Sequence, residues 1–365
     1  MEPSLDFSHS EQDRAVSYHR PLYLATLGDA VLGTAVLVVL RWTWPGRELW
    51  HTVEEAGWAG AAAAWAAIVV LASWLVRAPL SCWRGWWRER RWGFSTQSFG
   101  AWLADQGKGL AISVVLLAGA WTGVVALAHA LPGWWPAPAA AGAALAVLFL
   151  SFVAPLLLEP VFNRFTPLAD EALAAELLAL GERAAVPVRE VLVADASRRT
   201  TKVNAYVSGI GRTRRVVVYD TLLEAADTGA LKTVVAHELG HRRERDVAKL
   251  TIVGMAGAVA AVLLVWGVLG TRVASGRELP VALLLLSAFQ LVTMPLGAAW
   301  SRKLEYRADR WSLDLTGDLA AFERAFEELG RRNLSDPAPP RLAYLFLFGH
   351  PTVPERVAAA RARAA

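Results

Sequence analysis

The residues with the clearest chemical potential are those of the segment His-Glu-Leu-Gly-His, residues 237–241. His237 and His241 are four residues apart, so on an α-helix both imidazoles lie on one face and can bind a single metal ion. Glu238, beside the first histidine, is placed to act as a general base. No proline interrupts residues 228–250, which favours a helix. Because the chain has only 7 His, two solvated surface histidines at this spacing are the weaker interpretation.

A catalytic zinc ion needs three protein ligands and one open position for water. We predict Glu305 as the third ligand. Asp309, one turn further on the same helical face, is expected to accept a hydrogen bond from a ligand imidazole. The alternative is an ordinary Glu–Asp surface pair. Cys82 is the only cysteine, which excludes a site built from several cysteine ligands. The prediction is one Zn²⁺ per chain.

Further candidates lie on either side of this segment. His350 is predicted to donate to a developing oxyanion, with Arg356 close by for substrate binding. Both could instead be helix-start residues. Asn204, Ala205 and Tyr206 lie in a strand-like segment, which could pair with an extended substrate if it forms a sheet edge, or serve as an ordinary structural strand.

Composition indicates a membrane protein. Hydrophobic residues make up 55% of the chain, charged residues only 19%, and there are 17 Trp, a residue that gathers at membrane–water interfaces. The net charge of +4 is modest and the basic residues cluster in predicted loops, so they indicate membrane topology and argue against nucleic-acid binding.

Six stretches approach the roughly 20 apolar residues that cross a bilayer. They are predicted near 22–41, 58–76, 109–131, 139–158, 250–269 and 280–299. Asp29, within the first, must face protein or water. Residues 1–20 are expected to form a cytoplasmic tail, and 77–106, rich in Arg and Trp, a positive-inside loop. An even number of spans places both chain ends on one side, the cytoplasm by the basic-residue rule.

The fifth and sixth spans are expected to continue the two helices that carry the metal ligands. Both ligands would then lie within about 15 Å of the bilayer surface, and the metal would act on substrates at or in the membrane.

A soluble insert is predicted between the fourth and fifth spans. It contains a helix at 168–184, strands at 188–193, 202–207 and 215–219, and the metal helix from about Thr228. Gly209 and Gly211 are expected in the turn between the last two strands. The predicted domains are a membrane region at 1–158, the cytoplasmic zinc protease insert at 159–249, two spans at 250–300, and a helical C-terminal region at 301–365 that completes the site.

Several separated motifs resemble those of the type I CAAX prenyl proteases, which are integral-membrane zinc endopeptidases. The resemblance covers roughly residues 80–360. The matching segments are Gly93–Phe99 with Asp105 and Lys108, Phe162–Leu168, Asn204–Tyr206 with Gly209, Tyr219–Leu223, the His-Glu-Leu-Gly-His segment, Glu305 with Asp309, Asn333–Ser335, and His350-Pro351 with Glu355-Arg356.

The resemblance implies a mostly α, polytopic membrane protein with about six transmembrane helices around an internal chamber, and an α+β zinc protease domain at its cytoplasmic end. It implies His237, His241 and Glu305 on zinc and Glu238 as base. It also implies that Asn204 and His350 hold the substrate backbone or the oxyanion, and that lipidated peptides are cut near their C-terminus. Eukaryotic members have seven spans, so one early span is expected to be absent here.

Two alternative functions differ in substrate or chemistry. One is a quality-control protease that resembles the heat-shock-induced bacterial membrane zinc proteases. The other is a transporter or scaffold with a structural zinc, for which no fourth protein ligand is evident. The expected partners are a peptide or lipidated-peptide substrate and membrane lipid, with no nucleic acid and no required oligomer. The Ala- and Arg-rich composition suggests a bacterial plasma membrane.

Overall fold

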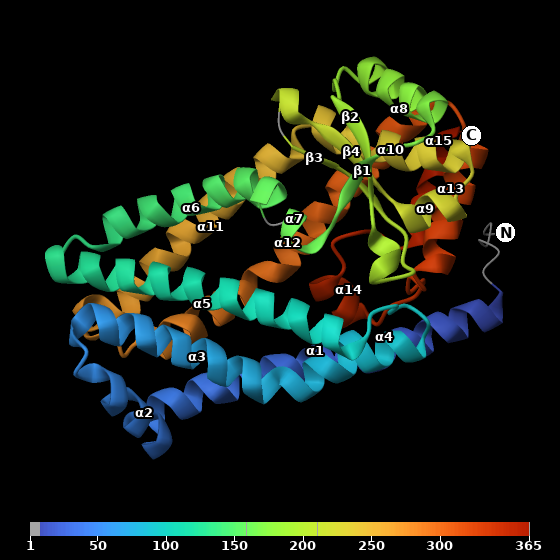
Figure 1. Cartoon of the computed structure of the whole chain (residues 1–365). Helices are drawn as coiled ribbons and strands as arrows, with labels where there is room; N and C mark the ends of the chain where they lie inside the picture. Colours follow the sequence, from blue (N-terminus) through green and yellow to red (C-terminus); the bar gives the residue numbers. More distant parts are fainter. Residues whose placement is uncertain (1–7, 158, 210, 365) are drawn as a thin grey trace.

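Six long apolar helices form the body of the protein. The structure, a computed structural model, describes residues 8–157, 159–209 and 211–364. Within these residues six helical segments are long and apolar enough to cross a membrane, which confirms the six predicted spans. They belong to α1 (His9–Trp42), α3 (Gly57–Cys82), α5 (Phe99–Ala130), α6 (Pro136–Leu157), α11 (Asp246–Leu269) and α12 (Leu279–Thr316). In Figure 1 a small sheet and several helices lie together at one end of this body.

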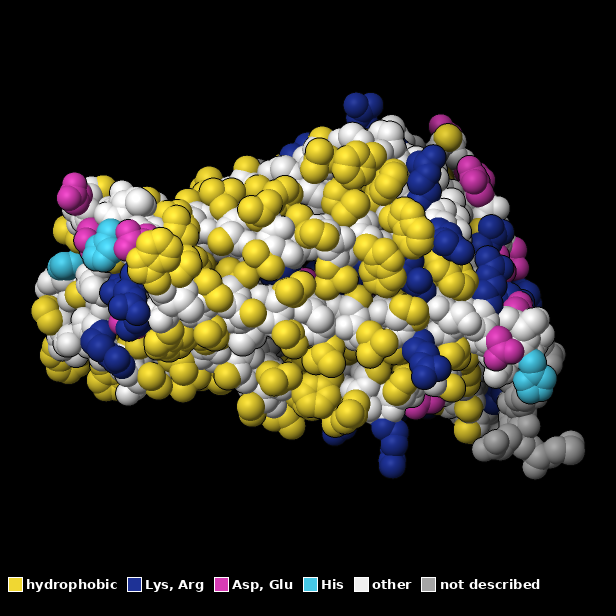
Figure 2. All heavy atoms as spheres, turned by 90° about the horizontal axis from the view of Figure 1, so that it is seen from below, with side chains coloured by type: hydrophobic (Ala, Val, Ile, Leu, Met, Phe, Trp, Pro, Cys, Tyr) yellow, Lys and Arg dark blue, Asp and Glu magenta, His cyan; other side chains and the backbone are white. Residues whose placement is uncertain are grey.

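The outer surface of the helices is apolar along its length. Val115 on α5 is 70% exposed, and Val292 and Leu296 on α12 are 74% and 73% exposed. Hydrophobic side chains cover the middle of the molecule in Figure 2, whereas charged side chains gather toward its two ends. Such a large apolar surface is costly in water and suits contact with lipid. The protein is therefore a polytopic membrane protein.

The end of the body far from the sheet is held by tryptophans. Trp65 of α3 is fully buried among the helices. The indole N–H of Trp121 donates to the Gly276 carbonyl at 2.8 Å, and that of Trp135 to the Gly270 carbonyl at 3.2 Å. Both carbonyls flank the short connection between α11 and α12. The indole rings bury apolar surface there, while their N–H groups provide hydrogen-bond donors for these two carbonyls. The short helix α2 (Trp44–Glu54) packs at the same end.

The first helix begins earlier than expected. Instead of a tail to residue 20, α1 begins at His9, and residues 1–7 of the expected tail lie outside the described part of the chain. Ser8 caps this start: its hydroxyl accepts from the Glu11 N–H at 3.3 Å, and the Glu11 carboxylate accepts from the Ser8 N–H at 2.9 Å. This reciprocal pair satisfies two donors at the helix start, so the polar residues 9–20 are stable as helix.

The segment 77–106, predicted as a loop, is mostly helical. Helix α3 continues through a π-helical turn, Trp83–Trp87, into α4 (Arg88–Arg91), and α5 already begins at Phe99. The Arg88 guanidinium lies 5.4 Å from the ring centroids of both Trp83 and Trp92. Because arginines and tryptophans stack on one another here, the charged segment is satisfied while remaining helical.

A four-stranded mixed sheet forms the core of the second region, in the order β1-β2-β4-β3. The pair β2–β4 is parallel, whereas β1–β2 and β3–β4 are antiparallel. Strand β3 therefore lies at the sheet edge. The strands are β1 (Phe165–Pro167), β2 (Glu190–Ala194), β3 (Ala205–Ser208) and β4 (Arg215–Tyr219). Three agree with the sequence prediction; β1 was missed because three residues that include a proline carry no detectable period.

Helices cover the sheet and lead to the membrane. One face packs through buried residues such as Leu177, Val218 and Val235 onto α8 (Glu171–Arg183) and α10 (Thr228–Arg243). The remaining helices are α7 (Glu159–Phe162), α9 (Asp220–Ala225), α13 (Leu319–Arg332), α14 (Arg341–Leu347) and α15 (Val353–Ala364). Helix α10 begins at the predicted residue because the Asp227 carboxylate accepts from the Ala230 N–H at 2.7 Å.

The two helices of the predicted site enter the membrane differently. Helix α12 is one continuous helix of 38 residues that contains Glu305, as predicted. The prediction that the histidine helix also continues into the membrane is wrong. Helix α10 ends at Arg243, Arg245 has a left-handed φ of 55°, and α11 starts anew at Asp246. A non-glycine residue in that conformation breaks the helical path.

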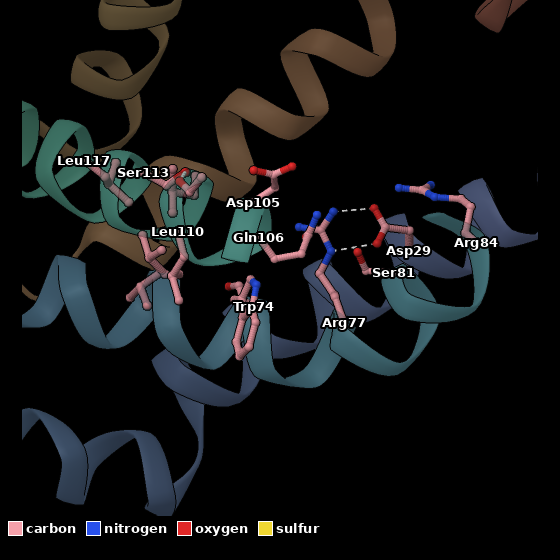
Figure 3. Close-up of a pocket in the computed structure, with 15 residues that line it drawn as sticks. Asp29, Trp74, Arg77, Ser81, Arg84, Asp105, Gln106, Leu110, Ser113 and Leu117 are labelled. Carbon is pink, nitrogen blue, oxygen red and sulfur yellow. Dashed lines mark hydrogen bonds and ion pairs between the residues drawn. The ribbon is translucent and has the colours of Figure 1, made fainter. Parts of the chain in front are cut away.

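Asp29 of the first span faces protein, as its charge requires. Figure 3 shows Asp29 on α1 opposite Arg77 on α3, beside a cavity that α5 also lines. The Arg77 Nε donates to Asp29 Oδ1 at 2.8 Å. The cavity has a volume of about 460 Å³ and contains further polar side chains, among them Ser73, Arg84 and Gln106. A charged pair inside a membrane helix bundle is stable only with such partners.

We expect Arg77→Gln to destabilise the protein by about 1–2 kcal/mol, because Asp29 keeps its charge but loses its ion pair with Arg77. This is less than the cost for a fully buried pair, since the two side chains are 41% and 17% exposed. The double variant Asp29→Asn/Arg77→Gln should recover most of the loss. Thermal unfolding of the detergent-solubilised proteins measures both effects, and a double variant less stable than the single one would contradict this account.

Candidate metal centre

Three side chains from two helices converge at the sheet end of α12. His237 Nε2 lies 3.3 Å from Glu305 Oε2, and His241 Nε2 lies 3.3 Å from Glu305 Oε1. One ligand atom from each residue lies within 4.8 Å of the other two. His237 and Glu305 are buried, and His241 is partly buried. Two imidazoles and a carboxylate at this separation are a donor set that fits a transition metal such as zinc.

The second nitrogen of each imidazole has its own carboxylate. His237 Nδ1 lies 2.9 Å from Asp309 Oδ1, and His241 Nδ1 lies 3.0 Å from Asp246 Oδ2. Both carboxylates are at least 95% buried. A carboxylate on Nδ1 fixes the tautomer that leaves Nε2 available as a metal ligand, and it raises the basicity of the ring. Both rings are therefore oriented toward the same point.

Glu305 provides the clearest sign that the centre needs a cation. Its Oε2 atom is buried and makes no hydrogen bond of good geometry within the described residues. Nitrogens of His237, His350 and Arg356 lie at 3.3, 2.8 and 3.7 Å from it, but none of them forms a hydrogen bond with it. A buried carboxylate oxygen without a donor is costly. A metal ion between the three residues would satisfy this oxygen, so the site fits a metal.

A glycine allows the two helices to come this close. An added Cβ at Gly240 would lie 3.3 Å from both the Cα and the carbonyl oxygen of Ala308, and 3.4 Å from the Cβ of Trp311. Helices α10 and α12 therefore touch almost backbone to backbone beside the histidines. Nearby, the buried Ser312 hydroxyl donates to the Thr233 carbonyl at 2.9 Å and ties the same two helices.

The charges around His237 favour a bound cation or proton. Burial and the Arg356 charge act to lower the pKa of His237, but its close contacts with the carboxylates of Asp309 and Glu305 outweigh them and raise it to about 9. Burial likewise acts to lower the pKa of His241, and hydrogen bonds to Glu305 and Asp246 reverse the effect and raise it. A metal must therefore displace a proton from the site, so its affinity depends on pH.

A cleft of about 550 Å³ opens beside these residues. Glu238, Asn204 and Ala205 line it together with His237 and Glu305, as expected for a base and a substrate strand. Tyr206 is different: successive side chains alternate across a strand, and its ring packs near Tyr219, at a centroid distance of 6.4 Å. The tyrosine side chain does not line the cleft.

His350 and Arg356 also reach the site, in different environments. His350 is 70% exposed at the cleft, with its Nδ1 2.8 Å from Glu305 Oε2. Arg356 is buried: its Nε donates to Asp309 Oδ2 at 2.8 Å, and its guanidinium carbon lies 3.9 Å from the centroid of the Phe326 ring. Arg356 thus holds the carboxylate that orients His237.

Asp246 was missed by the sequence prediction. It bonds Arg307 of α12 as well as His241, and Lys249 lies 3.3 Å from its Oδ1. The available signal was an aspartate at the start of an apolar span, since such a residue needs a partner. Its partner could not be assigned because the spacing from His241 does not fit one continuous helix.

The comparisons with known proteins agree with this architecture. Residues 167–364 match the model of peptidase family M48, and residues 7–164 match the CAAX prenyl protease N-terminal family, described as five membrane helices. The chain belongs to peptidase family M48. Within the described part of residues 7–164, four helical segments are long enough to cross a membrane, one fewer than that description counts.

Individual relatives come from bacteria, plants and fungi. The chain is 33% identical over 226 residues to YhfN, an uncharacterized metalloprotease of Bacillus subtilis, and 27% identical over 295 residues to the CAAX prenyl protease 1 homolog of Arabidopsis thaliana. These alignments cover 58% and 77% of this chain, and 52% and 69% of those proteins. The chain thus spans about half the length of the Bacillus relative.

A solved structure shows the same fold. The crystal structure of S. mikatae Ste24p superposes with a TM-score of 0.81 over 99% of this chain and 92% of that one, at 20% identity. Together with the family match, these findings identify the chain as a polytopic membrane member of a metalloprotease family, with the His-His-Glu cluster as its candidate metal site.

We expect Gly240→Val to lower the zinc affinity of the purified protein by about tenfold or more, because the added side chain separates α10 from α12 and moves Glu305 away from the imidazoles. Gly257→Val on α11 is the control, since the same substitution there meets open space. Metal content after dialysis against a zinc buffer measures the effect. Equal zinc binding by the two variants would show that the close contact does not set the site.

We expect the metal-free protein to lose stability as the pH rises from 6.5 to 9. His237 has a pKa of about 9 in the folded protein, above its ordinary value of 6.5, so its proton stabilises the fold fully below 6.5 and progressively less up to 9. A metal ion held by the three residues would replace that proton, so the protein loaded with zinc should not show this loss. Melting temperatures across this pH range test the prediction, with His237→Gln as control. A flat or rising metal-free curve would contradict it.

Proposed function

We propose that this protein is a zinc-dependent endopeptidase that hydrolyses peptide bonds at the membrane surface. The observation that carries the proposal is the convergence of His237, His241 and Glu305 beside an open cleft, with a carboxylate on the second nitrogen of each imidazole. We assign these three residues as ligands of one Zn²⁺ per chain. Asp309 and Asp246 orient the imidazoles, and Arg356 holds Asp309.

In this proposal Glu238 is the general base. It lies next to His237 on α10 and lines the same cleft, so its carboxylate faces the space where water and substrate meet. When bound, zinc supplies a Lewis acid that lowers the pKa of a coordinated water and polarises the scissile carbonyl. Glu238 takes a proton from the attacking water and returns it to the leaving amine.

The remaining residues bind substrate in this proposal. Edge strand β3 offers main-chain groups to an extended peptide, and Asn204 and Ala205 lie where it borders the cleft. Tyr206 pairs with Val217 of β4, so it supports the strand and offers no main-chain group to the substrate. His350, exposed beside Glu305, is placed to donate to the oxyanion. Arg356 borders the cleft but is largely buried, so in this proposal it acts mainly by holding Asp309, which orients His237.

We place the catalytic region on the cytoplasmic side of a bacterial plasma membrane. The arginines of α4 lie at the same end of the helices as the sheet. An excess of Lys and Arg marks cytoplasmic segments. This arrangement supports the assignment of residues 1–158 and 250–300 to the membrane, and of 159–249 and 301–365 to the cytoplasmic catalytic region.

The substrate class we propose is the lipidated peptide. Relatives from Arabidopsis thaliana and Saccharomyces cerevisiae carry the name CAAX prenyl protease 1, at 27% and 28% identity. The nearness of the cleft to the membrane supports a substrate anchored in lipid. Three protein ligands beside an open cleft favour catalysis over a structural zinc, since structural sites are closed by a fourth ligand.

Glu238→Gln should lower kcat for a farnesylated CAAX peptide by about 10²–10⁴-fold while the zinc content stays at the wild-type value, because the amide cannot accept the proton. A chelator should abolish wild-type activity, and added zinc should restore it. Unlipidated peptide and an unfolded membrane protein serve as comparison substrates. Cleavage of the unfolded protein alone would favour quality control. Full activity in Glu238→Gln would exclude Glu238 as the base.

A further inference from the structure

Along strand β3 and the residues just before it, every second residue points its main-chain N–H and C=O away from the sheet. The Tyr219 N–H of β4 donates to the Asn204 carbonyl at 3.0 Å, so Asn204 faces β4. In an antiparallel pair, hydrogen-bonding groups of successive residues point in opposite directions. The main-chain groups of Val203, Ala205 and Val207 therefore point outward from the sheet edge. These are the positions at which another strand could pair with β3.

Two of the three outward positions are already used. The side-chain amide of Asn333 pairs with Val203 as a peptide would: its Oδ1 accepts from the Val203 N–H at 3.0 Å, and its Nδ2 donates to the Val203 carbonyl at 3.0 Å. At the other end, the Arg242 guanidinium donates to the Val207 carbonyl. Within the described residues, Ala205 is the one of the three whose N–H and C=O both lack such a partner.

The segment that begins with Asn333 is fixed on both of its sides. Beyond Asn333, the Leu334 carbonyl bonds His19 Nε2 at 2.7 Å, and Tyr23 donates to Asp336 Oδ2 at 2.6 Å. His19 and Tyr23 belong to membrane helix α1. Residues 333–336 thus connect the edge strand to α1, and Asn333, Ser335 and Asp336 line the cleft. We call this segment the cleft wall.

We propose that Asn333 is a positioning residue that ends the peptide-binding edge of β3. Its amide takes the ladder position at Val203 that a longer bound strand would need. A substrate strand then registers on Ala205, beside His237 and Glu238. This inference rests on the proposed peptidase function and adds a limit on substrate length.

The orientation of the bound strand determines which end of the substrate is limited. A peptide that adds antiparallel to β3, the more stable pairing, runs with its C-terminal half toward Val203 and the cleft wall. Only a short segment then fits between the scissile bond and the wall. Asn333 is therefore the residue that limits how many substrate residues can follow the scissile bond.

The test uses full-length, zinc-loaded protein and peptides that share one cleaved core. The core is lengthened one residue at a time at its C-terminus, and in a second series at its N-terminus. For wild type we expect kcat/KM to fall steeply once the C-terminal extension reaches the wall, with a single cleavage position. In Asn333→Ala, we expect long C-terminal extensions to be cut about tenfold faster relative to short ones, as expected for the loss of one blocking backbone position.

The position of the cut is the second readout. Side chains on a strand point to the same face at every second residue. A substrate that shifts along β3 therefore keeps its side chains on the same faces only if it shifts by two residues. Mass spectrometry of the products should therefore show a new cut displaced by two residues in Asn333→Ala. A loss of stability alone would lower every rate without moving the cut.

Two further variants keep the test decisive. Arg332→Ala removes the exposed neighbour of Asn333, whose side chain pairs with Glu328, and should preserve the wild-type length profile. Asn333→Asp keeps an acceptor for the Val203 N–H but loses the donor, so its profile should be intermediate, and it substitutes for Asn333→Ala if that variant does not fold.

A wild-type profile independent of C-terminal length, or unchanged profiles in both Asn333 variants, would overturn the inference. Sensitivity to N-terminal length alone would overturn the orientation. A wild type that cuts no peptide at all would contradict the proposed function instead.

Discussion

The structure depends on the close contact between α10 and α12. Gly240 lies against the backbone at Ala308, and no side chain separates the two helices there. On α12 the residues that meet α10 recur every three or four positions: Glu305, then Ala308 and Asp309, then Ser312. One helical face therefore supplies three things. These are the candidate ligand Glu305, the Asp309 carboxylate that contacts His237, and the surface that packs against α10. Any change in the distance between the helices would alter all three together.

The break between α10 and α11 has a chemical consequence at the same site. On an uninterrupted helix, a residue five positions after His241 would point well away from it. The left-handed Arg245 turns the chain, and Asp246 then begins a new helix with its carboxylate 3.0 Å from the His241 ring. An acidic group is favourable at a helix N-terminus. The break that ends α10 therefore also brings the Asp246 carboxylate to His241.

The accuracy of the sequence predictions follows from the range of the interactions involved. The apolar stretches and the start of α10 depend on residues a few positions apart, and the structure has them where the pattern predicted. Two of the failures depend on distant partners. Asp246 finds His241 only across a helix break, and the arginine-rich segment stays helical because Arg88 reaches the carbonyls of Ser17 and Tyr18 on α1 as well as its own tryptophans. No local pattern records such contacts.

The lengths of the membrane helices explain how the cleft is fixed relative to the bilayer. A span needs about 20 residues, whereas α1 has 34 and α12 has 38. The additional turns of α12 carry Glu305, and the N-terminal half of α1 carries His19 and Tyr23, which bond the cleft wall. Further along α1, Asp29 pairs with Arg77 beside the membrane cavity. Because the same helices cross the membrane and border the cleft, the depth of the cleft is tied to the tilt of the helix bundle. In the proposed function, a substrate therefore reaches the cleft from the membrane surface.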